Sequence, residues 1–420
     1  MVRLGMREPR DCRPRAGDRQ LGRLRRLAWI LSACAALGHP PVDAREHQRS
    51  LADALAITAA PSDLAANPQL LARLRGSPHG YFRFVNVAFS RVVCERFQDV
   101  AAELPAVNLH GDAHVEQYAV TSLGRGLTDF DDSSTGPFVI DLMRLGVSVR
   151  LAAFQRHWDH NDGAILAALL RGYRSALLDP GFDPPEPSIV GRLRANFTAD
   201  HARRLEEADA LMTSIGGEMS DRVREAGLEY AEGLLAAHPE LPRNFFTIKR
   251  VGVLRMGIGS ALDRKLLARV EGPTASDDDD VLLEAKEVKD ISMIGCVSAP
   301  PGAGRILAGH SRIANQPFLF AGFLRFDGAT FWLHAWPDDY AEVTVAALQS
   351  PRELEELALD AGAQLGRGAP RALPGAADGP LREAVVRSLA RHESRIRKEI
   401  EDFADATIDA WARFRRKRTP

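Results

Sequence analysis

The segment VNLHGDAHVEQY places four groups that can ionise or bind a metal directly after an apolar run: His110, Asp112, His114 and Glu116. Such side chains suit metal binding, proton transfer or a polar turn. The segment TDFDD supplies a further carboxylate, Asp129, a short distance downstream. The intervening residues suffice for a short hairpin, so we expect Asp112 and Asp129 to face one cleft.

Two carboxylates in one cleft could divide the work of phosphoryl transfer. One would take the proton of a hydroxyl, while the other would hold a divalent ion that bridges phosphate oxygens. The protein contributes mainly positioning and charge neutralisation to such a reaction. Each carboxylate also has a structural interpretation, because an aspartate at a turn commonly caps backbone amides. The segment DFDD on its own could equally be a solvated loop.

Two downstream segments could bind phosphate. GIGS (257–260) reads as a glycine-bearing hairpin whose backbone amides could face phosphates, although one small glycine loop is a weak signal. LEAKE places Lys286 within an apolar strand, where an ammonium is costly to bury without an acidic partner or a phosphate. An edge strand with Lys286 facing water is the alternative.

The elements that must position these residues follow from the spacing of apolar side chains. The stretch 138–154, which carries Asp141 and Arg144 one turn apart, is apolar on most sides and predicts a buried helix. AVNL before the HGDAH turn predicts a strand. Helical patterns also fill 50–76, 80–97, much of 160–237 and the C-terminal region, whereas strands are expected around 245–340. This order predicts the α+β class with two lobes.

Composition excludes some function classes. The 54 basic and 56 acidic residues nearly cancel, so no global charge favours nucleic acid. The cysteines are far apart and form no CxxC pair, so neither a zinc site nor a disulfide framework is expected. They are Cys12, Cys34, Cys94 and Cys296.

Residues 1–44 read differently from the rest. An arginine-rich start precedes LAWILSACAAL (27–37), which is too short to span a membrane, and small residues follow. This pattern is typical of a secretory signal, and LSAC resembles a lipoprotein cleavage box that would lipidate Cys34. We expect a periplasmic or lipid-anchored protein if the segment is a signal, without a transmembrane span in the mature chain. A start codon assigned too early, and hence a cytoplasmic protein, is the alternative.

Taken as an ordered set, the motifs resemble the bacterial domain of unknown function 2252 (DUF2252) family and, more distantly, aminoglycoside phosphotransferases and protein-kinase-like enzymes. The matching segments are SPHGYFRFVN, GDAHVEQY, TDFDD, GPFVIDLMRL, GIGSALDR and LEAKE. No single segment is specific, but the ordered set is. In ordinary kinases the glycine loop and lysine precede the catalytic loop, whereas here they follow it.

The resemblance implies a protein-kinase-like two-lobe fold with permuted motif order. After the signal-like segment, the helical lobe with the catalytic loop would span 45–240. A small antiparallel-sheet lobe would span 241–345, and C-terminal helices at 346–420 would pack on the helical lobe.

The resemblance also implies roles for individual residues. Asp112 would be the catalytic base and His110 would brace its loop. Asp129 would be the principal metal ligand, and Asp131 would be either a second ligand or a loop residue. Asp141 and Arg144 would form a structural ion pair that supports the loop.

Lys286 would hold the phosphates of ATP or another nucleotide, and Gly257, Gly259 and Ser260 would cover them. Two departures from the family stand out. Gln117 replaces an asparagine whose carbonyl would complete the magnesium shell, and magnesium demands a tight octahedron. Ala261 or Leu262 replaces a glycine, which makes the loop less permissive.

The function expected from these features is ATP- and magnesium-dependent phosphate transfer to a hydroxyl of a small molecule. A nucleotide-binding pseudokinase or interaction module without turnover is the main alternative. A metal-dependent phosphoesterase is a lesser one, because GDAH resembles a Gly-Asp-x-His element but no Gly-Asn-His follows.

Overall fold

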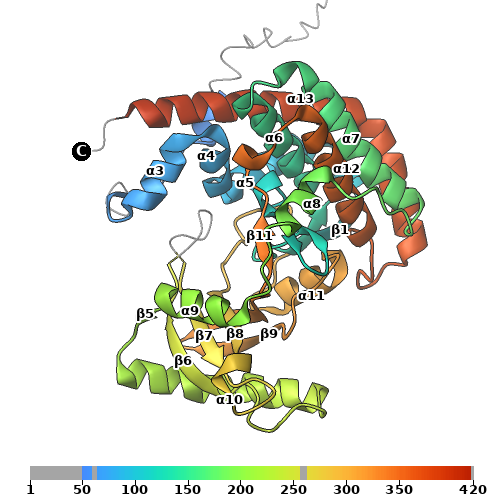
Figure 1. Cartoon of the computed structure of the whole chain (residues 1–420). Coiled ribbons are helices and arrows are strands. Elements are labelled where there is room, and N and C mark those ends of the chain that lie inside the picture. The colour runs from blue at the N-terminus through green and yellow to red at the C-terminus, as the bar shows by residue number, and fades with distance from the viewer. Residues whose placement is uncertain (1–49, 59–63, 256–262, 418–420) are drawn as a thin grey trace, which may run out of the picture. The chain divides into compact units, whose positions relative to one another are not determined.

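The computed structural model describes residues 50–58, 64–255 and 263–417, which all belong to one unit, Ala44–Pro420. Figure 1 shows helices and sheets along the chain, and every strand pair within the described ranges is antiparallel. The α+β class predicted from the sequence is therefore confirmed.

The helices before the six-stranded sheet are α3 (Pro68–Gly76), α4 (Pro78–Phe84), α5 (Asn86–Arg96), α6 (Val139–Gln155), α7 (Asp162–Leu178), α8 (Ser188–Arg194), α9 (His201–Leu211) and α10 (Gly217–Ala237). The later helices are α11 (Gly304–Ile313), α12 (Pro351–Gly368) and α13 (Asp378–Arg416). The strands are β1 (Ala106–Leu109), β2 (Tyr118–Thr121), β3 (Arg125–Leu127), β4 (Ser134–Pro137), β5 (Thr213–Ser214), β6 (Ile248–Val253), β7 (Lys265–Val270), β8 (Val281–Glu287), β9 (Gly322–Phe326), β10 (Ala329–Ala335) and β11 (Tyr340–Glu342).

Helix α6 lies at the centre of the helical core, as its apolar sequence predicts, and it packs against α4, α5, α7, α12 and α13. Helices α7 and α12 lie especially close to each other (Figure 1). A Cβ atom added at Gly172, Gly362 or Gly366 would overlap a backbone carbonyl oxygen of the facing helix. Glycine at these three positions therefore permits the close approach of the two helices.

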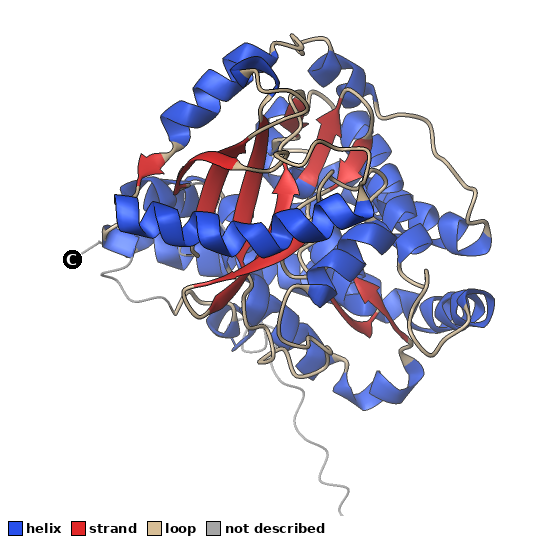
Figure 2. Cartoon of the chain, turned by 90° about the horizontal axis from the view of Figure 1, so that it is seen from below, coloured by secondary structure: helices blue, strands red, loops and turns tan. Residues whose placement is uncertain are grey.

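The largest sheet has the strand order β5-β6-β7-β8-β10-β9. Its apolar face, which includes Leu266, Leu283 and Leu333, packs against α10 in a hydrophobic core separate from that around α6. Figure 2 shows this helix lying across the strands. Because β8 is flanked by β7 and β10, the alternative of an edge strand for Lys286 is wrong.

Two smaller sheets position the HGDAH turn. Strand β1 pairs with β4 and leads directly into His110. The hairpin expected between Asp112 and Asp129 is formed by β2 and β3, and β11 extends it into a three-stranded sheet. The stretch 245–340 needs one correction, since α11 interrupts the strands expected there. The predicted boundaries at 240 and 345 stay a prediction.

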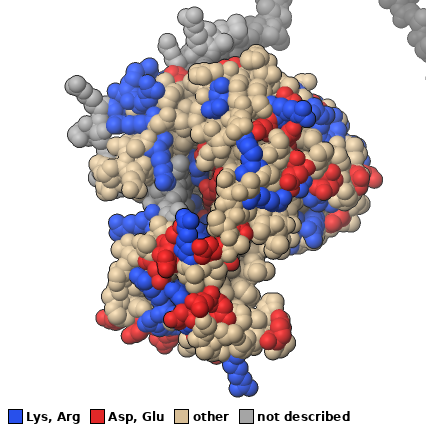
Figure 3. Space-filling view, viewed as in Figure 1, with Lys and Arg blue, Asp and Glu red and all other residues tan. Residues whose placement is uncertain are grey.

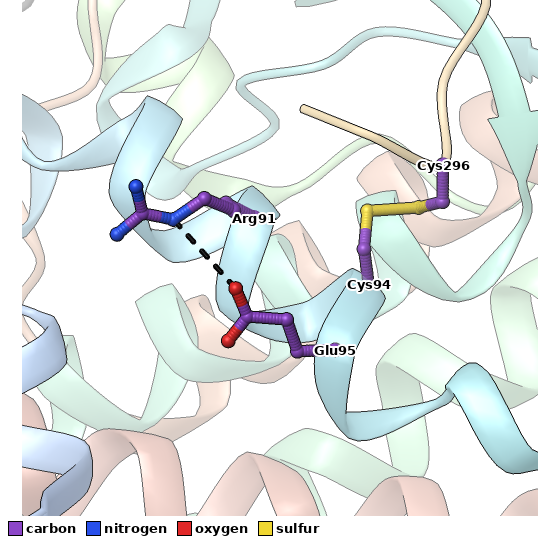
Figure 4. Close-up of a disulfide and its surroundings, with 4 residues drawn as sticks. All are labelled: Arg91, Cys94, Glu95 and Cys296. Atoms are coloured by element: carbon purple, nitrogen blue, oxygen red, sulfur yellow. Dashed lines mark ion pairs between the residues drawn. A yellow bond between two sulfur atoms is a disulfide. The ribbon is translucent and has the colours of Figure 1, made fainter. Parts of the chain in front are cut away.

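A disulfide joins Cys94 on α5 to Cys296, 202 positions later in the chain (Figure 4). The sequence predicted no disulfide framework and did not anticipate this pair, because the fold brings together two cysteines that share no local spacing pattern. The other two cysteines, like Gly257, Gly259 and Ser260, lie outside the described residues. In the part of the chain that the structure describes, no helix combines the length and apolar character needed to cross a membrane.

Figure 3 shows basic and acidic side chains intermixed over much of one face. This view agrees with the near-balance of charge in the sequence. The expectation that the protein binds no nucleic acid stays a prediction.

Candidate functional site

A cavity of about 760 Å³, called the site cavity below, is lined by the HGDAH turn, by the segment after β3 and by one face of the six-stranded sheet. It brings together seven residues that the sequence singled out: Asp112, His114, Glu116, Gln117, Asp129, Asp131 and Lys286. His110, Asp141 and Arg144 are buried and are not among its lining residues.

Asp141 holds the backbone of the HGDAH turn. Its carboxylate accepts hydrogen bonds from the amide of His110 at 2.7 Å and from that of Gly111 at 2.9 Å. Gly111 has φ +85°, and a Cβ there would overlap the carbonyl oxygen of Asp132. The turn therefore requires glycine at this position for both backbone conformation and space.

His110 lies inside this turn with both ring nitrogens engaged. Nε2 lies 2.9 Å from the carbonyl oxygen of Thr128, which can only accept, and Nδ1 accepts from the amide of Asp112 at 3.3 Å. Burial lowers the pKa of His110, although the charge of Asp141 opposes the shift. The neutral imidazole thus ties the turn to the segment that leads to Asp129.

Asp112 is paired with Arg144, not with a residue of its own loop. Nε of Arg144 donates to Oδ1 of Asp112 at 2.8 Å, and the guanidinium lies 3.6 Å from the centre of the Phe82 ring. The predicted ion pair between Asp141 and Arg144 is therefore wrong: both contact the loop, but separately. Burial raises the pKa of Asp112 to about 7, against the opposing charge of Arg144.

Lys286 lies between two carboxylates. Its Nζ donates to Oδ1 of Asp129 at 2.8 Å and lies 3.6 Å from Oδ2 of Asp131. Burial alone would raise the pKa of Asp129, but the charge and hydrogen bond of Lys286 hold it well below the usual range. Burial and the charge of Asp129 raise the pKa of Asp131 to about 7.

Two further side chains fix these carboxylates. Nε2 of Gln117 donates to Oδ2 of Asp129 at 3.0 Å, and Nε1 of Trp332 donates to Oδ1 of Asp131 at 2.6 Å. Asp129 itself has φ +62°, a conformation that few non-glycine residues adopt. Backbone strain of this kind is often retained at functional sites.

The described ranges contain no cluster of three or more histidine, cysteine, aspartate or glutamate side chains arranged to hold a metal. Asp129 and Asp131 supply two carboxylates, and Gln117 adds an amide that can offer its oxygen after a flip of the side chain. Magnesium commonly takes one or two protein carboxylates and completes its shell with phosphate oxygens and water. The donors present therefore fit a magnesium ion bound together with a phosphate.

The polar face of the sheet adds residues that the sequence analysis did not single out: Lys265 on β7, Glu284 on β8, and Trp332 and His334 on β10. Strand register puts them together, since Lys286 lies opposite both Lys265 and Trp332, and Glu284 lies opposite His334. The alternation of apolar and polar residues in VLLEAKE could have indicated that Glu284 and Lys286 share a face.

Helix α4, from the segment SPHGYFRFVN, forms another part of the cavity wall. Nη1 of Arg83 donates to Oε2 of Glu116 at 3.0 Å, and His79 Nε2 lies 2.8 Å from Oγ of Ser148 on α6. The backbone amide of Val345 donates to the other carboxylate oxygen of Glu116. Glu116 in the HGDAH segment thus links α4 to the chain after β11.

The comparisons with known proteins agree with the motif set. The family model described as "Uncharacterized protein conserved in bacteria (DUF2252)" matches residues 65–190 and 186–416. No curated protein and no solved structure matches the chain. The family match spans nearly the whole described chain and includes every residue that lines the site cavity. The chain therefore belongs to the DUF2252 family of uncharacterized bacterial proteins.

Proposed function

We propose that this protein is an ATP- and magnesium-dependent phosphotransferase that acts on a hydroxyl of a small molecule. The observation that carries the proposal is the arrangement around Lys286. This buried lysine on a central strand contacts Asp129, and a second carboxylate, Asp112, lines the same cavity and has a pKa that burial raises to about 7. A positioned base and a lysine beside a potential metal ligand are the parts that phosphoryl transfer needs.

Asp112 is suited to the role of base in this reaction. A carboxylate with a pKa near 7 balances the fraction that is ionised against its strength as a proton acceptor. Arg144 holds one oxygen of Asp112, so the other can face the acceptor hydroxyl in the site cavity. Asp112 would take the proton from that hydroxyl as the hydroxyl oxygen attacks the terminal phosphorus of ATP. The bond from that phosphorus to the bridging oxygen would break, and ADP would leave.

Lys286 and Asp129 would bind the phosphate donor. The ammonium of Lys286 can contact phosphate oxygens, and Asp129, Asp131 and Gln117 would hold magnesium. A magnesium ion held there would neutralise part of the charge of the phosphates. Gly257, Gly259 and Ser260 would cover the phosphates; they lie outside the described residues, and this role stays a prediction.

A protein-kinase-like scaffold is part of the proposal. Two features support it. The helical region and the six-stranded sheet have separate hydrophobic cores, and residues of both regions line the site cavity. The order of motifs along the chain would be permuted relative to kinases.

Nucleotide binding without turnover is the second candidate. It is favoured by Gln117, which replaces the family's asparagine and directs its amide nitrogen at Asp129. A protein that binds ATP with magnesium but transfers no phosphate to any acceptor would fit this candidate.

Thermal unfolding with and without ATP and magnesium tests the proposal. A ligand that binds only the folded state raises its stability, by about 2.7 kcal/mol at a hundredfold excess over Kd. We expect a magnesium-dependent rise in Tm that Asp129→Ala abolishes. Asp278→Ala, at an exposed aspartate away from the cavity, should retain it. The absence of a shift in the folded wild-type protein would contradict ATP as the donor.

A further inference from the structure

Two lysines lie side by side in the site cavity. Lys265 on β7 is directly opposite Lys286 on β8, and the two residues are only 5% and 8% exposed. Residues directly opposite in an antiparallel pair point to the same face of the sheet, with Cβ atoms roughly 4.5–5.5 Å apart. Both side chains line the site cavity. The sheet therefore presents two neighbouring ammonium groups to the same space.

This pairing is unfavourable for the protein alone. Like charges directly opposite each other destabilise a sheet, and burial adds a desolvation cost. Burial and the charge of Lys286 lower the pKa of Lys265. Carboxylates offset part of this cost: Asp129 and Asp131 contact Lys286, and the charges of Glu284, Asp129 and Asp131 oppose the lowering of the Lys265 pKa.

A third cation adds to the positive charge. Lys289, shortly after β8, also lines the site cavity and lies 3.1 Å from Oδ2 of Asp263. An anionic ligand that reached these lysines would offset the repulsion between Lys265 and Lys286. A ligand with neighbouring phosphates can offer oxygens to both lysines at once and so suits this pair.

We propose that Lys265 is a second phosphate-binding residue and that the donor is a chain of condensed phosphates contacted by Lys265 and Lys286 together. This inference rests on the proposed function, since it names the donor class of the same cavity. A nucleoside triphosphate and an inorganic polyphosphate share this chemistry. Their binding must be compared to distinguish them.

The competing explanation is structural. Lys265 would then serve as a counter-ion for the buried carboxylate of Glu284, which lies two positions before Lys286 on β8. The two roles predict opposite effects when the charge of Lys265 is removed. A counter-ion is needed for stability, whereas a phosphate ligand is needed for binding and costs stability in the absence of the phosphate.

The experiment compares wild-type protein with Lys265→Met, Lys265→Arg and Lys398→Met. Lys398 is an exposed lysine on α13 and controls for the loss of one positive charge. Calorimetric titration with ATP, inorganic tripolyphosphate and AMP, each with magnesium, gives the Kd values, and thermal unfolding gives the ligand-free Tm.

We expect Lys265→Met to bind ATP or tripolyphosphate roughly ten- to a hundredfold more weakly, as for the loss of one contact to a charged group. Its affinity for AMP should change little, and its ligand-free Tm should equal or exceed that of wild type. Lys265→Arg should bind within a few-fold of wild type, and Lys398→Met should match it. Tight binding of tripolyphosphate itself would identify an inorganic donor, whereas tight binding of ATP alone would identify a nucleotide.

Unchanged affinity of Lys265→Met for both condensed phosphates would overturn the inference and leave the proposed function standing. A lower Tm with unchanged affinity, or a variant that does not fold, would show that Lys265 serves as the counter-ion of Glu284 instead. If wild-type protein bound neither ATP nor tripolyphosphate, the proposed function itself would fail.

Discussion

Arg144 places a fully buried guanidinium against Asp112, with Nε 2.8 Å from Oδ1 and the charged group stacked on the Phe82 ring. A second guanidinium nitrogen donates to the Phe82 carbonyl at 3.0 Å. The arginine therefore fixes one oxygen of Asp112 and ties the HGDAH turn to α4. Removing one partner of such a buried pair leaves the other charge uncompensated.

Arg144→Met should lower the free energy of unfolding by about 3–5 kcal/mol, the usual cost of breaking a buried ion pair. Chemical denaturation measures this loss. Arg150→Met, on the same helix but paired with Asp162 at a more exposed site, is the matched control and should cost about 1 kcal/mol or less. Adding Asp112→Asn to Arg144→Met should recover part of the lost stability. If Arg144→Met and Arg150→Met lowered the free energy of unfolding equally, the buried pair would not be the more stabilising of the two.

The pKa of Asp112 predicts how turnover depends on pH. A base must be ionised, and burial raises the pKa of this carboxyl to about 7. Below pH 7 the proposed transfer rate should therefore fall about tenfold per pH unit, and above it the rate should level off. A rate profile of kcat/KM between pH 5 and 9, once an acceptor is found, measures this. A profile flat down to pH 5 would exclude Asp112 as the base.

The raised pKa of Asp112 has the opposite consequence for stability: turnover should increase as pH rises, whereas the free energy of unfolding should decrease. Because the folded-state pKa of Asp112 lies above its unfolded value, its contribution to stability is fully present below about pH 4 and is lost as pH rises to about 7. Asp112→Asn cannot ionise, so its stability relative to wild type should increase across this window. Denaturation at pH 4.5 and pH 7.5 checks the sign. A constant difference between the two proteins would contradict the raised pKa.

Parts of this site could be predicted from sequence because local patterns determine them. The apolar stretch at 138–154 became α6 (Val139–Gln155), and the spacing of Asp112 and Asp129 fitted the β2–β3 hairpin. Lys286 in an apolar run did occupy a central strand. Short-range spacing was enough for the helix and the hairpin, whereas the sequence left open whether Lys286 lay on a central or an edge strand.

The rest depends on contacts between distant segments. Helical spacing favoured an ion pair between Asp141 and Arg144. Instead, Asp141 accepts hydrogen bonds from two backbone amides of the HGDAH turn, and Arg144 pairs with Asp112. The place of Lys265 beside Lys286 depends on strand register, which pairs residues across a loop. Helix α11 within the strand-rich stretch and the disulfide across 202 positions likewise follow from tertiary packing.

Gly111→Ala tests whether the turn tolerates a side chain. The residue has φ +85°, and an added Cβ would overlap the Asp132 carbonyl oxygen, so the backbone must move. We expect a loss of roughly 1–3 kcal/mol, as for other strained backbone positions, with loss of ATP-dependent stabilisation. Gly163→Ala on α7, where nothing lies within 4 Å, should be neutral or stabilising by up to about 1 kcal/mol. Similar effects at both positions would contradict the strained turn.

Removal of the disulfide should destabilise the protein because Cys94 and Cys296 close a very long loop. The double variant Cys94→Ser/Cys296→Ser should lose about 2–5 kcal/mol, most of it through the less constrained unfolded chain. Dithiothreitol should lower the Tm of wild type but leave that of the double variant unchanged. If peptide mapping under non-reducing conditions found the two cysteines unlinked, the prediction would fail at its first step.

Gln117 is the departure from the family pattern with the most direct contact to the proposed metal ligand. Its longer side chain reaches Asp129 and donates a hydrogen bond at 3.0 Å. If the amide helps to hold Asp129 and magnesium, Gln117→Leu should weaken magnesium-dependent ATP binding roughly tenfold or more, since contacts to charged groups contribute about 1.5–3 kcal/mol. Gln349→Leu, at an exposed glutamine outside the cavity, is the control. Gln117→Asn separates the two candidate functions: a gain of phosphate transfer would mean that glutamine had weakened an enzyme, whereas reduced binding would mean that this chain needs the longer reach.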